Sequence, residues 1–148
     1  MMSYVSEMRA LIGHKSLLLT GVNEQGEILL NLRSDTDSWG IPGGCLESGE
    51  NLEETAAREL YEETGLRAER MTLLTVLSEP EYRFTYPNGD QTESVIALYR
   101  AEGVRGELRM NDGKSEQLRY FPLRQLPPLE SRAAQVIRVI HSQSFDRP

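Results

Sequence analysis

The chain has 148 residues and a formal net charge of −7 at pH 7, and 39% of its residues are hydrophobic while 26% are charged. This length and composition predict one globular domain over residues 1–148, and no apolar run approaches the roughly 18 residues of a membrane span. The negative charge argues against a nucleic-acid polymer as partner, because binding to a phosphate backbone relies on Lys and Arg.

The N-terminal residues predict a short helix rather than a secretory signal. Ser3 can cap a helix over residues 3–12, in which Tyr4 and Met8 stand at helical spacing. The segment has neither a basic start nor a long apolar stretch. A single cysteine, Cys45, rules out an intrachain disulfide and is typical of a reducing compartment. We therefore expect a cytoplasmic protein.

Two strands are predicted next, over residues 17–22 and 27–33. The residues between them, 23–26 (NEQG), favour a turn, so the two strands are expected to pair as a hairpin. Residues 34–44 (SDTDSWGIPGG) contain a proline and paired glycines that indicate a tight approach to the following helix. Cys45 has no evident His partner, so a packing role is favoured over that of a nucleophile.

A helix is predicted over residues 52–64, with a signal at each end. Asn51 is a good N-cap, and Glu54 stands three residues later, which is the capping-box arrangement. Gly65 follows the last helical residue, where glycine commonly ends a helix. The helix should therefore begin and end sharply.

The second half of the chain predicts further strands separated by polar turns. These strands are residues 71–77, 82–86, 93–100 and 117–121. A turn at residues 87–90 (PNGD) joins the second and third strands, and a polar loop at residues 111–116 precedes the fourth. Ser131 then caps an amphipathic helix that extends to about residue 143.

The predicted central helix gathers negative charge on one face. Glu59, Glu62 and Glu63 are related by i,i+3 and i,i+4 steps, so their carboxylates can converge outside the helix. Because clustered anions repel one another, such a face needs a cation, and hard oxygen ligands suit Mg²⁺ or Mn²⁺. Arg58 is expected to point elsewhere and to pair with Glu50, which would pin the preceding loop to the helix. A solvated acidic helix face is the alternative.

Residues 44–66, GCLESGENLEETAARELYEETGL, resemble the signature of the Nudix hydrolase family. That signature reads G-x5-E-x7-R-E-U-x-E-E-x-G-U, where U is aliphatic, and it matches here without a departure. The matching positions are Gly44, Glu50, Arg58, Glu59, Leu60, Glu62, Glu63, Gly65 and Leu66. A chance match in a chain of this length has a probability below about one in a million.

The resemblance extends over residues 17–126 and implies an α/β fold, the Nudix α/β/α sandwich with a central mixed β-sheet. One departure is the first strand region, LLLTGVNEQG, which has fewer aliphatic residues than is usual in the family. We therefore expect this strand to be trimmed or shifted in register. Because that part of the sheet commonly lines the nucleoside pocket of relatives, the departure bears on substrate preference more than on metal binding.

The resemblance also implies a reaction: metal-dependent hydrolysis of a nucleoside diphosphate linked to another group, with release of a nucleoside monophosphate. The expected cofactor is Mg²⁺ or Mn²⁺. The implied metal ligands are the carboxylates of Glu59, Glu62 and Glu63 and the backbone carbonyl of Gly44. Glu50 and Arg58 would support these ligands from behind. The expected partner is a small-molecule nucleoside diphosphate derivative, with no membrane involved. Homodimerisation is common in the family, and the sequence does not decide it.

A general base must lie near the attacking water. In relatives it comes from the signature helix or from a distant loop, so Glu62 and Glu116 are the candidates. Glu116, in the polar loop, resembles the loop position. An ordinary exposed loop acid is the alternative for this residue.

The substrate is indicated only by scattered residues. Arg33 could bind phosphate, although a solvated arginine at a strand end is the alternative. Trp39 and Tyr82 offer surfaces on which a base can stack. For Tyr82, which alternates with Phe84 and Tyr86, a place on one side of a packed sheet is the alternative. Pro80 lies near the position of a proline in relatives that cleave ADP-ribose. A nucleotide-sugar such as ADP-ribose is therefore favoured over a nucleoside triphosphate such as an oxidised dGTP.

Two other functions remain as alternatives. Some Nudix-like domains only bind nucleotides and regulate transcription or partner proteins, but such domains typically lose signature glutamates that this chain retains. Isomerisation of a diphosphate would need a suitable catalytic cysteine, and Cys45 precedes the helix in the wrong setting. Hydrolysis is therefore the favoured function.

Overall fold

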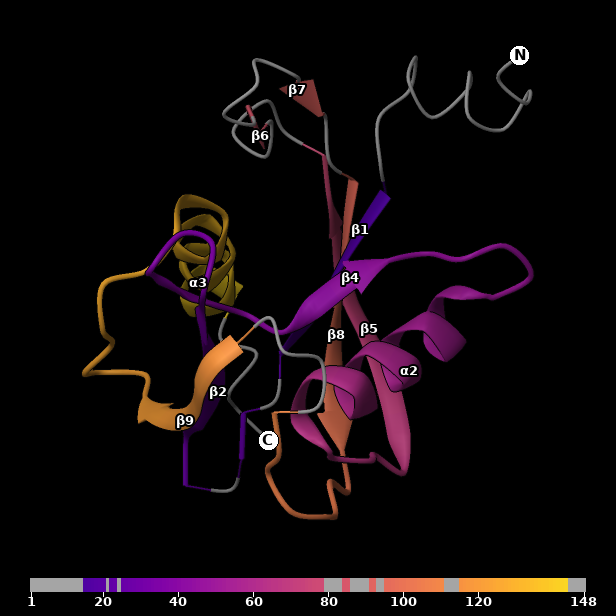
Figure 1. Ribbon diagram of the computed structural model, residues 1–148, viewed down its shortest axis with the longest axis horizontal. Helices are drawn as coiled ribbons and strands as arrows, with labels where there is room; N and C mark the ends of the chain where they lie inside the picture. Colours follow the sequence, from indigo (N-terminus) through magenta and orange to yellow (C-terminus); the bar gives the residue numbers. More distant parts are fainter. Residues whose placement is uncertain are drawn as a thin grey trace.

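The protein is represented by a computed structural model that describes residues 15–20, 22–23, 25–78, 84–85, 91–92, 95–110 and 115–143. Its strands are β1 (Lys15–Thr20), β2 (Glu27–Arg33), β3 (Trp39–Gly40), β4 (Gly43–Cys45), β5 (Arg70–Leu77), β6 (Phe84–Thr85), β7 (Gln91–Thr92), β8 (Val95–Glu102) and β9 (Ser115–Pro122). Its helices are α2 (Leu52–Thr64) and α3 (Ser131–Gln143) (Figure 1). The helix expected at residues 3–12 and the turn at residues 87–90 lie outside the described residues.

The strands form one mixed sheet and smaller antiparallel ones. The four-stranded sheet has the order β4-β1-β8-β5; β1 runs parallel to β8, whereas β4 and β5 are antiparallel to their neighbours. The three-stranded sheet has the order β3-β2-β9 and is antiparallel. Strands β6 and β7 pair with each other, Phe84 opposite Thr92. The strand predicted at residues 93–100, which was expected to pair with residues 82–86, is instead β8 of the four-stranded sheet. The expected central mixed sheet is therefore present.

The predicted hairpin between the first two strands is wrong. The turn itself forms, because the Asn23 carbonyl accepts from the Gly26 N–H at 3.0 Å. However, β1 and β2 belong to different sheets, and the flanks of the turn are joined by the isolated bridge between Val22 and Ile28 and by hydrogen bonds between Asn23 and Glu27. The reason is that both edges of β1 are already paired, with β4 and β8, and both edges of β2 are paired with β3 and β9. The first strand spans Lys15–Thr20, two residues earlier than predicted, and the expectation that it is trimmed relative to the family stays a prediction.

Helices α2 and α3 cover opposite faces of the strands (Figure 1). On β2, Ile28 and Leu30 pack in one core cluster with buried residues of α3, whereas Leu29 packs in a second cluster with residues of α2. Strand β8 divides in the same way, with Ile96 in the first cluster and Ala97 in the second. Because side chains alternate along a strand, each of these strands supplies both cores. The result is the expected α/β/α sandwich.

The C-terminal helix has the predicted bounds, since α3 spans Ser131–Gln143. Its buried face consists of Ala133, Val136, Ile137 and Ile140. Strand β9 begins two residues earlier than the predicted strand at residues 117–121. Ser115 pairs with Arg33 of β2, so Ser115 and Glu116 already belong to the strand.

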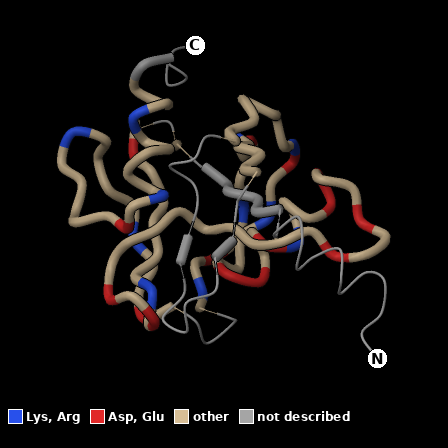
Figure 2. The backbone as a smooth tube through the Cα atoms, turned by 90° about the horizontal axis from the view of Figure 1, so that it is seen from above, with Lys and Arg blue, Asp and Glu red and all other residues tan. Residues whose placement is uncertain are grey.

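Charged residues of both signs are interspersed over the molecule. Figure 2 shows lysine and arginine distributed among aspartate and glutamate along the described part of the chain, rather than gathered on one face. A protein that binds a nucleic-acid backbone commonly carries a basic stripe or patch. The expectation that the partner is a small molecule rather than a nucleic-acid polymer stays a prediction.

Candidate functional site

The acidic helix begins and ends as its sequence predicts. The Asn51 side chain accepts from the backbone N–H of Glu54 at 2.8 Å, and the Glu54 carboxylate accepts from the backbone N–H of Asn51 at 3.1 Å. This reciprocal pair is the capping box. Gly65 ends the helix with φ 78°, a left-handed conformation that favours glycine. Buried Ala56 and Leu60 hold α2 on the sheets, so the glutamates of its outer face are presented from a fixed support.

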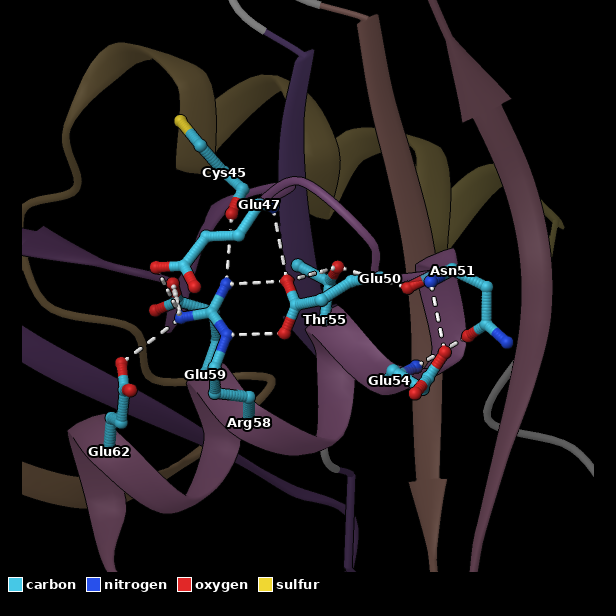
Figure 3. A network of polar contacts seen from close by, with 9 residues as sticks. All are labelled: Cys45, Glu47, Glu50, Asn51, Glu54, Thr55, Arg58, Glu59 and Glu62. Carbon is cyan, nitrogen blue, oxygen red and sulfur yellow. Dashed lines mark hydrogen bonds and ion pairs between the residues drawn. The ribbon is translucent and has the colours of Figure 1, made fainter.

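Arg58 and Glu50 form the expected pair between the helix and the preceding loop (Figure 3). The Nε of Arg58 donates to Oε2 of Glu50 at 2.6 Å, and a terminal nitrogen donates to Oε1 at 3.0 Å. Thr55 adds its hydroxyl to Oε1 at 3.0 Å. The hydrogen bonds from Arg58 are the largest cause that lowers the pKa of Glu50 to about 2. The carboxylate therefore stays ionised, and the loop is fixed to α2.

The same guanidinium also contacts the acidic face, so the expectation that Arg58 points elsewhere is wrong. Its NH1 donates to Glu59 at 2.8 Å and to Glu62 at 3.2 Å. Its NH2 donates to the backbone carbonyl of Cys45 at 3.0 Å. Arginine has five N–H donors in a planar fork, which lets one side chain serve the loop and the helix together. Part of the repulsion among the glutamates is thus balanced by a cation of the chain itself.

Gly44 and Glu59 lie in direct contact. A Cβ placed on Gly44 would overlap the carboxylate of Glu59. Only glycine therefore lets the backbone approach this side chain so closely. The structure brings together five of the predicted site residues, which are Gly44, Glu50, Arg58, Glu59 and Glu62.

The three glutamates differ in environment. The Glu62 side chain is 52% exposed and that of Glu59 only 14% exposed, while Glu63 is buried at 6%. Glu63 lies within electrostatic range of Arg33. In the described part of the chain, no three His, Cys, Asp or Glu side chains are gathered as they would be around a metal ion. Glu59 and Glu62, two of the expected ligands, instead accept hydrogen bonds from Arg58. The ligand assignment therefore stays a prediction.

Arg33 lies at the end of β2 and is engaged by Asp35. Its Nε and NH2 donate to the two carboxylate oxygens of Asp35 at 3.0 and 2.9 Å. The hydrogen bond with Asp35 is the largest cause that raises the pKa of Arg33, and Glu130 and Glu63 add to it. Arg33 therefore lies within electrostatic range of Glu63 of the signature helix, and its role toward phosphate stays a prediction.

The other predicted residues lie on separate elements. The Trp39 ring packs edge-on against Phe121, with centroids 4.8 Å apart, and joins the core cluster of α3. Glu116 is exposed near the start of β9. Tyr82 and Pro80 lie outside the described residues.

One polar residue near the site was not predicted. Asn31 is only 3% exposed, and its side-chain nitrogen donates to the hydroxyl of Ser115 at 3.0 Å. The sequence does carry a signal, because an asparagine interrupts the apolar run ILLNL of β2. A buried polar residue at the centre of a strand usually has a partner or a function.

The comparisons with known proteins decide the family. The NUDIX domain matches residues 16–140 of the chain. The protein belongs to the Nudix family.

The relatives of this Nudix protein include a curated enzyme and a solved structure. The chain is 33% identical to the ADP-ribose pyrophosphatase of Methanocaldococcus jannaschii, over 84% of this chain and 72% of that protein. It is 40% identical to a putative 8-oxo-dGTP diphosphatase of Bacillus subtilis, over 42% of each chain. The crystal structure of the MutT NUDIX hydrolase of Burkholderia pseudomallei aligns with a TM-score of 0.70 at 31% identity, covering 84% of this chain and 95% of that one.

The fold is therefore the Nudix fold, and the family and its named relatives mark the chain as a Nudix-type pyrophosphohydrolase. Nudix hydrolases generally use a divalent metal, and part of a donor set for such an ion is present here. Glu59 and Glu62 offer hard carboxylate oxygens, and the glycine at position 44 brings backbone against the first of them. No helix among the described residues is long and apolar enough to cross a membrane.

Proposed function

We propose that this Nudix protein hydrolyses the diphosphate of ADP-ribose or a related nucleotide-sugar, with Mg²⁺ or Mn²⁺ as cofactor. The proposed activity is supported by the complete signature. It is also supported by the hydrogen bonds of Arg58, which connect Glu50 of the loop to Glu59 and Glu62 of the acidic face. The substrate class is supported by the match to an ADP-ribose pyrophosphatase over 84% of the chain. The exposed thiol of Cys45 agrees with a cytoplasmic setting, which we propose as well.

The proposed reaction adds water across one phosphorus–oxygen bond of the diphosphate. The oxygen of water forms a new bond to phosphorus, the bond to the bridging oxygen breaks, and AMP and ribose 5-phosphate are the products. Glu59, Glu62 and Glu63 and the carbonyl of Gly44 would hold the cation. When bound, the cation neutralises diphosphate oxygens and lowers the pKa of the attacking water.

The remaining roles belong to protein groups. Glu116 would accept the proton of the attacking water, as the base that the reaction requires. Glu50 and Arg58 act by position, because their hydrogen bonds hold the loop and Glu59 in place. A ligand whose orientation is fixed by such partners keeps its geometry during turnover.

The test is hydrolysis by purified protein of a panel that contains ADP-ribose, other nucleotide-sugars, dinucleoside polyphosphates, and normal and oxidised dNTPs. Each substrate is assayed with Mg²⁺, with Mn²⁺ and with a chelator, and the products are identified by chromatography. Release of AMP from ADP-ribose that stops with chelator supports the proposal. Cleavage of an oxidised dNTP alone would contradict the proposed substrate class. Failure to hydrolyse any substrate of the panel would contradict catalysis.

A further inference from the structure

Asn31 makes a buried hydrogen bond that joins the second half of β2 to the start of β9. It lies on β2, and its partner Ser115, at the start of β9, is only 8% exposed. The Asn31 Oδ1 has no hydrogen-bond partner among the described residues, so the 3.0 Å bond to Ser115 holds this side chain. Burying a side-chain amide costs free energy unless its polar atoms are hydrogen-bonded. An apolar residue would pack here at lower cost, which indicates a role beyond packing.

Ser115 stands next to a β-bulge that contains Glu116. In the ladder between β2 and β9, Leu32 pairs with Gln117 and Arg33 pairs with Ser115, so Glu116 is the extra residue. A bulge of this kind re-aims a side chain and is common next to active sites. The direction of the Glu116 side chain therefore depends on how the bulge is held.

The bond lies on the face of β2 that is turned toward the signature helix. Leu29 packs with residues of α2, and alternation places Asn31 and Arg33 on the same face as Leu29. Arg33 in turn lies within electrostatic range of Glu63 of α2. The start of β9 is thus fixed on the side of the acidic site.

We propose that Asn31 is a positioning residue, whose hydrogen bond to Ser115 holds the bulge so that the carboxylate of Glu116 is directed toward the acidic helix. This inference rests on the proposed function, in which Glu116 is the base. Neither Asn31 nor Ser115 contacts the substrate in this scheme. Their effect is on turnover rather than on substrate binding.

The test removes the bond with Ser115→Ala and keeps the hydroxyl with Ser115→Thr. A matched control is Thr72→Ala, which removes a hydroxyl that donates to Glu102 at 2.7 Å between β5 and β8, in the other sheet. Because a misplacement of about 1 Å can cost about 100-fold in rate, we expect Ser115→Ala to lower kcat for ADP-ribose by about 10- to 100-fold with little change in KM. Ser115→Thr should recover most of this loss, and Thr72→Ala should retain the wild-type kcat.

The decisive measurement repeats Ser115→Ala in a Glu116→Gln background. If Ser115 acts through Glu116, the second substitution adds no further loss, because residues that act as a unit are not additive. Asn31→Ala gives a second way to break the bond, and the thermal midpoint of each variant shows that it is folded.

The possible failures are distinguishable. A wild-type protein that hydrolyses ADP-ribose while Ser115→Ala retains full kcat would overturn the positioning role and leave the proposed function intact. If Ser115→Ala lowered kcat by the same factor in the Glu116→Gln background as in the wild type, the positioning role would also be overturned and the proposed function would stand. A wild-type protein without metal-dependent hydrolysis would overturn the proposed function, and the inference with it.

Discussion

The Nε of Arg58 lies 2.6 Å from Oε2 of Glu50, which joins the middle of the signature helix to the loop that precedes it. Both side chains are largely buried, at 20% and 17% exposure. Two parallel N–H donors meet the two carboxylate oxygens, and this bidentate geometry is specific to arginine. The predictions below concern this pair and its neighbours.

Replacement of Arg58 by lysine should destabilise the protein, because a single ammonium cannot make the forked contacts with Glu50. We expect a measurable loss in the free energy of unfolding, since hydrogen bonds to charged groups are removed. Urea denaturation measures this loss. Arg138→Lys, at an exposed position of α3, is the matched control and should change stability by less than about 0.5 kcal/mol. Equal stabilities of the two variants would contradict the importance of the pair.

Stability should depend on the ionisation of Glu50. Its pKa is lowered from 4.5 to about 2 in the folded protein, chiefly by the hydrogen bonds from Arg58. The contribution is therefore complete above pH 4.5 and is lost as the pH falls from there toward 2. Thermal unfolding of the wild type and Glu50→Gln, measured in chelator across this range, should show a difference that shrinks toward acid. A constant difference would contradict the prediction.

Gly44→Ala should reduce activity far more than stability. The new Cβ would overlap the carboxylate of Glu59, which is the far end of a flexible side chain and can move away. We expect little change in the thermal midpoint and at least about a 10-fold fall in kcat, because a site residue is displaced. Gly40→Ala is the control, since a Cβ there would meet its neighbours at 3.5 Å, an ordinary contact. Full activity of Gly44→Ala would show that the position of Glu59 is unimportant.

Glu62→Gln should nearly abolish turnover while the fold stays intact. The substitution keeps the shape of the side chain but removes the charge that is expected to hold the cation. The matched control is Glu53→Gln, which lies in the first turn of the same helix. Steady-state rates and Mn²⁺ binding by calorimetry separate the two variants. Near-normal rates for Glu62→Gln would rule out the assignment of the metal site.

Local signals predicted the elements that carry the site. The cap at Asn51, the terminal Gly65 and the start of α3 at Ser131 all depend on neighbouring residues, and they are observed as expected. Strand β2 has the predicted bounds, Glu27–Arg33. These features could be read because a helix end or an apolar strand is determined mainly by its own sequence.

Pairing between distant segments could not be read in the same way. The turn near Asn23 suggested a hairpin, but the strands on either side have both edges occupied by other parts of the chain. The bulge at Glu116 depends on the register between β2 and β9, which local patterns do not contain. The contacts of Arg58 with the acidic face also depend on where the preceding loop lies in space. Spacing alone predicted which residues belong to the candidate site, whereas their mutual contacts required the tertiary structure.

Strand β2 supplies side chains to both hydrophobic cores, and this restricts insertions and deletions within the strand during evolution. Ile28 and Leu30 face one core, while Leu29 and Asn31 face the other. A single-residue insertion within the strand would exchange the two faces and move Asn31 and Arg33 away from the acidic helix. An insertion in the turn at residues 23–26 leaves this alternation untouched. Length variation among homologous sequences is therefore expected at that turn, and the strand itself should remain free of gaps.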